Sequence, residues 1–111
     1  MATASTLQPL IASLDAVLLE SNYDPRMLAT GDYPAWLKQR IAGPHGHISN
    51  PESAELVQRA ASQRMKWVCL GHLSHDNNSP DLALRTHRQI LGQKLPVCVA
   101  TRYGPSDQME V

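Results

Sequence analysis

WVCLGHLSHDNNSP, residues Trp67 to Pro80, joins a short apolar run to a small, polar, turn-forming segment, and the change falls at Gly71-His72. The apolar half is typical of a buried strand, and the polar half is typical of the turn that follows one. A histidine at the end of a buried strand has a fixed backbone beneath it and an open cleft in front, which is how α/β proteins commonly present a ligand or catalytic group. His72 is therefore the first candidate functional residue, although a lone histidine at this place is more often a neutral, hydrogen-bonded imidazole.

Strand-like and helix-like segments alternate along the rest of the chain. The pattern predicts strands over Asp15–Ser21, Lys66–Leu70 and Leu95–Ala100, and helices over Thr3–Leu14, Pro25–Leu28, Pro34–Ala42, Pro51–Gln63 and Pro80–Leu91. Asn50 and Ser79 precede prolines and suit N-caps, and Gly43 and Gly92 suit helix ends. This order predicts an α/β architecture in which helices cover one or both faces of a small mixed or parallel sheet. So narrow a sheet leaves edges exposed unless another segment or chain pairs with them.

The core is expected to form around these strands. DAVLLES, residues 15–21, reads as a strand buried on both faces. The helix over residues 34–42 is expected to have one packed and one exposed face. The residues predicted to be mainly buried are Val17, Leu18, Leu19, Val68, Cys69, Leu70, Val97 and Val99, with Leu56, Val57, Leu82 and Ile90 packed over them.

Composition restricts the class of protein. A chain of 111 residues suits one modest domain. Ten basic and ten acidic side chains give no net charge, which disfavours a dedicated DNA-binding module. No signal peptide and no apolar run of about 20 residues is present, so a cytoplasmic protein without membrane association is expected. Cys69 and Cys98 lie in apolar runs, which favours buried thiols over a disulfide or a zinc site.

Two further polar segments accompany the strand end at His72. Glu20, Ser21, Asn22 and Asp24 follow the strand over residues 15–21, and the glycine-punctuated loop over residues 43–50 contains His45 and His47. Taken by themselves, a strand-end carboxylate is usually solvated and a loop histidine usually contacts backbone. Asp24 is best explained as the cap of the helix that begins at Pro25.

The motifs ESNYD (residues 20–24), GHISN (46–50) and GHLSHDNNSP (71–80), in this order, carry a resemblance to a known family. From about Leu7 to Ala100 the chain resembles the C-terminal part of a metallo-β-lactamase-fold hydrolase of the YycJ/WalJ-like branch. The resemblance implies that residues 1–101 form the C-terminal half of an αββα sandwich. The Gly, Pro, Ser and Asp content of residues 102–111 predicts a flexible tail.

The same resemblance implies roles for individual residues. His72 matches the family's last metal-binding histidine. His47 matches a histidine that relatives use in proton transfer or phosphate contact, and Glu20 matches its acidic partner. A glutamate beside His47 would hold the imidazole in one tautomer, as general acid or base catalysis requires. The remaining residues expected to contact substrate are Ser74, Asn77 and Asn78.

The implied cofactor is Zn²⁺, with Mn²⁺ as the alternative, in a two-metal site. The implied substrate is a phosphodiester of nucleic acid or a nucleotide. His45 and His47 are not taken as the metal signature, because the family's HxHxDH motif is missing. His75 and His87 are expected to be exposed, and His87 in particular to be a surface residue of its helix.

The missing HxHxDH motif implies that the isolated chain is inactive and that a missing N-terminal half completes the metal site. Self-association or pairing with that half is then expected through the uncovered sheet. The alternative, from another class of function, is a non-catalytic α/β interaction module that pairs through an open sheet edge.

Overall fold

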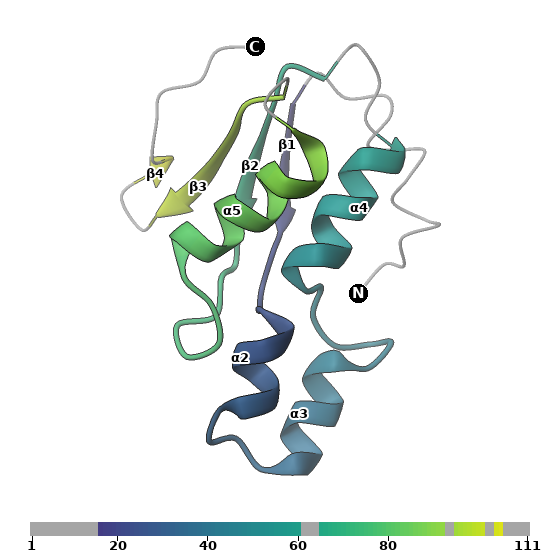
Figure 1. The fold of residues 1–111 in the computed structure, drawn as a ribbon, viewed down its shortest axis with the longest axis vertical. Helices are drawn as coiled ribbons and strands as arrows, with labels where there is room; N and C mark the ends of the chain where they lie inside the picture. The colour runs from purple at the N-terminus through teal and green to yellow at the C-terminus, as the bar shows by residue number, and fades with distance from the viewer. Residues whose placement is uncertain (1–15, 61–64, 93–94, 102–103, 106–111) are drawn as a thin grey trace.

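The computed structural model describes residues 16–60, 65–92, 95–101 and 104–105 (Figure 1). Strands β1 (Ala16–Glu20), β2 (Trp67–Gly71), β3 (Val97–Thr101) and β4 (Gly104–Pro105) form one sheet in the order β1-β2-β3-β4. The first three strands are parallel, and β4 pairs antiparallel with β3. The predicted strands are therefore confirmed, whereas the helix predicted over Thr3–Leu14 lies outside the described residues.

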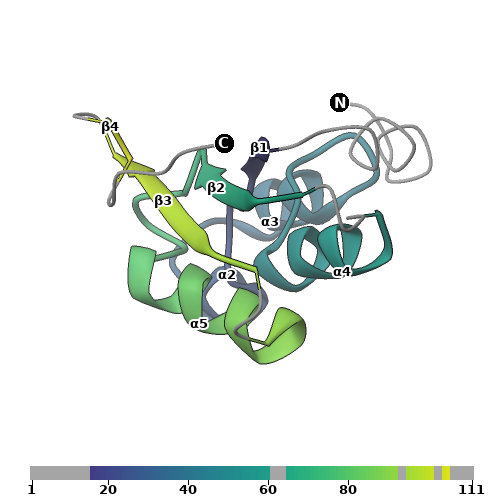
Figure 2. The same ribbon diagram turned by 90° about the horizontal axis from the view of Figure 1, so that it is seen from above.

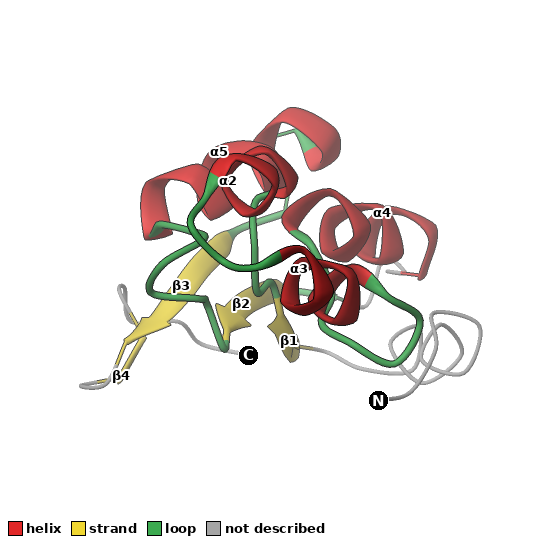
Figure 3. Cartoon of the chain, turned by 90° about the horizontal axis from the view of Figure 1, so that it is seen from below, coloured by secondary structure: helices red, strands yellow, loops and turns green. Residues whose placement is uncertain are grey.

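The described helices are α2 (Pro25–Thr30), α3 (Ala35–Ala42), α4 (Asn50–Ala60) and α5 (Pro80–Leu91). Figures 2 and 3 show α4 and α5 over one face of the sheet, which gives two layers, whereas Figure 1 shows α2 and α3 beyond the ends of the strands. Helices between parallel strands are the connections that such a sheet requires. The predicted α/β class is confirmed. None of the described helices is long and apolar enough to cross a bilayer.

The core lies between the sheet and helices α4 and α5. The parallel register aligns Val17, Val68 and Val97 in one row and Leu19, Leu70 and Val99 in the next. Because side chains alternate along a strand, both rows face the same layer. The fully or largely buried members of this cluster are Leu19, Leu56, Val57, Ala60, Met65, Val68, Leu70, Ala83, Val97 and Val99.

Three packing predictions were wrong in part. Leu18 is 67% exposed, because it alternates with the core rows and points to the face that the described helices leave uncovered. Helix α3 has no buried residue, and its Trp36 is 63% exposed, so it has no fully packed face. On α5, Leu84 and Leu91 pack against the core in place of Leu82 and Ile90.

Helix ends follow local chemistry, with one correction. The Asp24 carboxylate accepts from Met27 N at 2.9 Å, and Ser79 Oγ accepts from Leu82 N at 3.1 Å, so both predicted caps are confirmed. Helix α4 is capped by Ser49 and not by Asn50. Ser49 Oγ accepts from Glu52 N at 3.2 Å, and the Glu52 carboxylate accepts from Ser49 N at 3.1 Å. This capping box leaves the Asn50 side chain available for contacts inside the protein.

The cysteines and the end of the chain complete the fold. Cys69 and Cys98 are buried, and neither is in a disulfide, as predicted. They face each other across β2 and β3 in register. Gly104 and Pro105 pair with β3 inside the segment predicted to be a tail. The other residues of that segment lie outside the described part, so a flexible tail over 102–111 stays a prediction.

Candidate active site

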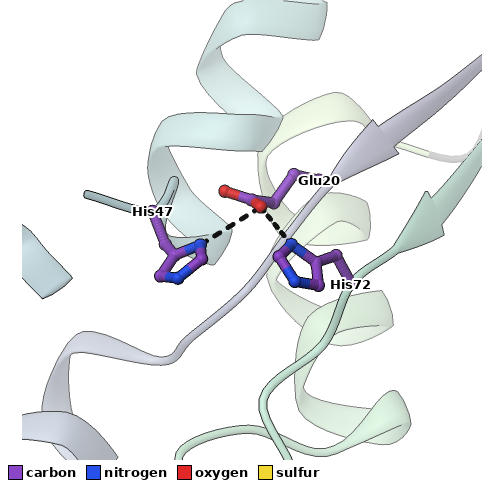
Figure 4. Close-up of side chains that lie close together, drawn as sticks. All are labelled: Glu20, His47 and His72. Atoms are coloured by element: carbon purple, nitrogen blue, oxygen red, sulfur yellow. Dashed lines mark hydrogen bonds and ion pairs between the residues drawn. The ribbon is translucent and has the colours of Figure 1, made fainter. Parts of the chain in front are cut away.

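Glu20, His47 and His72 come from three separate segments and meet at one end of the sheet (Figure 4). Glu20 ends β1, His72 follows β2, and the register places Glu20 beside Gly71. His47 comes from the loop between α3 and α4. One potential ligand atom from each residue lies within 4.8 Å of the other two. The structure therefore brings together the residues that the sequence motifs singled out.

The Glu20 carboxylate is shared by both histidines. Its Oε2 lies 3.3 Å from His47 Nδ1 and also contacts His72 Nδ1. Its Oε1 accepts from Ile48 N at 2.8 Å. The two imidazole rings lie edge to face, with centroids 5.1 Å apart. Both oxygens of one carboxylate thus orient the loop and the strand end toward each other.

The charge state of this cluster follows from its hydrogen bonds. Burial opposes ionisation of Glu20, but hydrogen bonds from Ile48 N–H, His72 and His47 outweigh it and lower the pKa of the carboxyl. Glu20 is therefore an anion at neutral pH and can only accept hydrogen bonds. Each neutral histidine must then carry its proton on Nδ1, which leaves the Nε2 lone pair of each ring available.

Exposure differs among the three side chains. Glu20 is 16% exposed, His47 is 38% exposed and His72 is 66% exposed. The carboxylate therefore lies beneath the two rings, and the rings face solvent. This arrangement can bind a cation or transfer a proton at the ring nitrogens while Glu20 controls their tautomer.

His72 has an unusual backbone conformation. Its φ of 57° is the only positive φ of a non-glycine residue in the described ranges. Such a conformation costs on the order of 1 kcal/mol and persists where surrounding contacts determine it. The Asn22 side chain supplies one such contact, since its Nδ2 donates to His72 O at 2.7 Å. The turn out of β2 is thus fixed in the form that directs His72 toward Glu20.

The loop that carries His47 is held from both sides. His47 N donates to Ile41 O at 2.8 Å, and Asn22 N donates to Ile48 O at 2.8 Å. A Cβ on Gly46 would lie 2.2 Å from Ile41 O, so this position requires glycine. These contacts connect the loop to the end of α3 and to the segment after β1.

The residues predicted to contact substrate are buried or half-buried. Asn77 and Asn78 are only 3% and 5% exposed, and the Asn78 side chain is hydrogen-bonded to backbone and to Asn50. Ser74 is half-buried, and its Oγ accepts from Asn77 N at 3.1 Å. Substrate contact by Ser74, Asn77 and Asn78 stays a prediction, and in this structure the Asn78 amide is occupied by hydrogen bonds within the chain.

His87 is the residue that sequence reasoning placed wrongly. It was expected on the surface, but it is fully buried, and its Nε2 lies 3.2 Å from Ser21 Oγ. Burial lowers the pKa of His87 to about 4, so the imidazole is neutral. The spacing of four residues from buried Ala83 was the available signal, because these two positions share a helix face. His75 is exposed, as predicted.

The donor set fits a transition-metal ion. Imidazole nitrogens and carboxylate oxygens are common ligands of Zn²⁺ and serve Mn²⁺ as well. Among the residues that the structure describes, Glu20, His47 and His72 are the group that could hold such an ion.

Comparison with known proteins supports the resemblance. The chain is 40% identical over 84 residues to the exodeoxyribonuclease WalJ of Streptococcus pneumoniae, which covers 76% of this chain and 31% of that protein. It is 35% identical over 88 residues to the exodeoxyribonuclease YycJ of Bacillus anthracis, covering 79% of this chain and 33% of that protein. No protein-family model and no solved structure matches. The resemblance to the YycJ/WalJ branch is confirmed, and the chain spans about a third of the length of these relatives.

Proposed function

We propose that this chain is part of a metal-dependent hydrolase that cleaves phosphodiester bonds in nucleic acid. Its two-layer unit would correspond to the C-terminal half of a metallo-β-lactamase sandwich. The convergence of Glu20, His47 and His72 is the observation that carries the proposal. The names of the relatives, which are exodeoxyribonucleases, support DNA as the substrate class.

His72 is the proposed metal ligand. It is the most exposed member of the cluster, and the ring nitrogen that does not face Glu20 has its lone pair available. Zn²⁺ is the preferred ion and Mn²⁺ the alternative. When bound, such an ion lowers the pKa of a coordinated water and stabilises charge on a phosphoryl group.

His47 is the proposed general acid or base, with Glu20 as its partner. The carboxylate keeps the Nδ1 proton in place, so Nε2 is the atom that takes up or delivers a proton. An imidazolium formed at His47 is stabilised by the adjacent Glu20 anion. The ring is partly exposed, so it can exchange a proton with a substrate oxygen directly or through one water molecule.

These roles leave the metal site incomplete. Hydrolytic zinc sites usually take three protein ligands and a water, and two-metal sites take more. If Glu20 and His47 transfer protons, His72 alone remains as a ligand. Since the chain spans about a third of its relatives, we infer that the other ligands come from sequence outside these 111 residues and that the chain alone is inactive.

Calorimetric titration of the metal-stripped chain with Zn²⁺ tests the proposal, together with a nuclease assay on single-stranded and double-stranded DNA. We expect weak Zn²⁺ binding that is abolished by His72→Ala. The substitution of His75, a neighbouring exposed histidine, by alanine should leave this binding unchanged. We expect no cleavage by the chain alone. Equal binding by the two variants would remove His72 as a ligand, and tight binding with turnover would contradict the incomplete site.

Leu18 favours a second, compatible role. Its 67% exposure places a large apolar side chain on the face of the sheet that the described helices leave uncovered. We propose that further polypeptide covers this face, either a second copy or the missing part of a longer protein. Analytical ultracentrifugation of the chain and of Leu18→Lys tests it: self-association that the lysine abolishes identifies a second copy.

A further inference from the structure

Directly behind the candidate site lies a buried network of polar side chains formed by Ser21, Asn50, Asn78 and His87. Ser21, Asn50 and His87 are fully buried, and Asn78 is 5% exposed. They come from the segment after β1, the first turn of α4, the turn before α5 and the middle of α5. Burying polar groups costs free energy unless they are hydrogen-bonded, so these four side chains are expected to depend on one another.

The backbone carbonyls next to this network determine which side-chain atoms donate and which accept. Asn78 Nδ2 faces the backbone carbonyls of Ser21 and Asn22 at 2.9 and 3.1 Å, and a carbonyl only accepts. The Asn78 amide is thereby oriented, and the Asn50 atom 3.0 Å from the same Nδ2 must be Oδ1. Asn50 Nδ2 then donates back to Asn78 Oδ1 at 2.8 Å.

The same reasoning sets the tautomer of His87. Ser21 Oγ lies 2.6 Å from Asn50 Oδ1, which only accepts, so the serine proton is used in that bond. His87 Nε2, 3.2 Å from Ser21 Oγ, must therefore be the donor. His87 Nδ1 then carries only a lone pair, and within the described part of the chain it has no hydrogen-bond partner.

The network also holds the backbone segments that carry the site. Ser21 directly follows Glu20, and its N–H donates to Gly71 O at 3.1 Å, the residue before His72. Asn22, whose carbonyl accepts from Asn78, donates through its side chain to His72 O. All these bonds join segments that are distant in sequence.

Asn50 extends this support to the loop of His47. It lies three residues after His47, and its N–H donates to Tyr23 O at 2.8 Å. Its side chain is joined to Ser21 and Asn78. Each of the segments that supply Glu20, His47 and His72 is therefore connected to the same buried network.

We propose that Ser21, Asn50, Asn78 and His87 position the Glu20–His47–His72 cluster, and that His87, through its Nε2–H donor to Ser21, is a positioning residue for the site. This inference rests on the proposed function only where metal affinity is the measured quantity. None of the four side chains needs to touch metal or substrate. Loss of a group that orients a metal ligand commonly changes metal affinity by 10- to 100-fold, and these residues act on the ligands through the backbone that carries them.

His87→Leu removes the donor at similar volume, and His87→Gln returns an amide N–H close to the place of Nε2. Leu84→Ala is the matched control, because Leu84 lies on the same helix and packs on the core but is not in the network. For each variant, the Zn²⁺ affinity is measured at a temperature well below that at which the variant unfolds. We expect about a 10-fold loss or more for His87→Leu, recovery for His87→Gln, and no loss for Leu84→Ala despite its lower stability.

Ring ¹⁵N chemical shifts of His47 and His72, recorded without metal, provide an independent readout. We expect His87→Leu to move them and Leu84→Ala to leave them in place. If the unmodified chain binds no Zn²⁺, the metal proposal fails, and these shifts alone decide the positioning role. If His87→Leu does not fold, Ser21→Ala takes its place. Unchanged shifts and affinity in the network variant, or equal changes in the Leu84 control, would overturn the inference.

Discussion

Glu20→Gln removes the negative charge of the shared carboxylate while keeping its shape. The glutamine carbonyl can still accept from Ile48 N–H, so the change acts on the two histidine contacts. A hydrogen bond to a charged group contributes about 1.5–3 kcal/mol when it is well buried. Because His47 and His72 are 38% and 66% exposed, we expect a loss of only about 1–2 kcal/mol for both contacts together at pH 7.

The loss of unfolding free energy in Glu20→Gln is expected to become smaller as the pH falls. Folding lowers the pKa of Glu20 from its ordinary value of 4.5, so the stabilisation from its ionised form is complete above that value. It disappears as pH falls through the lowered pKa, where the protonated acid resembles the amide. The difference in unfolding free energy between the parent and Glu20→Gln should therefore approach zero in acid.

Urea unfolding at pH 7 and at the lowest pH at which the parent chain still unfolds cooperatively measures this difference. Glu55→Gln, an identical charge change at an exposed position of α4, is the control and should have little effect at either pH. A difference for Glu20→Gln that is the same at both pH values would refute an ionised, hydrogen-bonded carboxylate. If Glu55→Gln lowered the unfolding free energy as much as Glu20→Gln does, the change in net charge would explain the result.

Two further substitutions test the support of the site. Leu70→Ala should lower the unfolding free energy by about 2–5 kcal/mol, because Leu70 is fully buried in the central strand β2. The control Leu18→Ala, on the uncovered face, should lower it by at most about 0.5 kcal/mol. Similar losses for the two variants would show that β2 is not the centre of the core. Gly46→Ala should cost about 1–3 kcal/mol and shift the His47 ring resonances, since the new Cβ would lie 2.2 Å from Ile41 O. Unchanged His47 resonances would show that the loop adapts without moving the ring.

Local signals predicted much of the fold. The strands around Val17, Val68 and Val99 and helix α5 follow from apolar runs bounded by turn residues. Asp24 and Ser79 begin helices and Gly92 ends one, as expected. These signals act between residues close in sequence, so they need no knowledge of the rest of the chain.

The motifs also identified Glu20, His47 and His72, but not how they contact each other. One Glu20 oxygen contacts both rings, and the other accepts from Ile48 N–H. These contacts depend on the register of β1 with β2 and on the loop after α3. Strand register is set by packing across the sheet, which sequence spacing alone does not specify.

The positions of Leu18, Asn50 and His87 were decided by tertiary structure alone. Leu18 has the composition of a core residue, but no described helix covers its face, so it stays exposed. A capping box takes over the role expected of Asn50, and α5 turns His87 toward Ser21, which supplies the partner that makes its burial tolerable. Burial of a polar side chain depends on partners that fold in from elsewhere in the chain, whereas caps, turns and strand-forming runs are determined by their nearest neighbours.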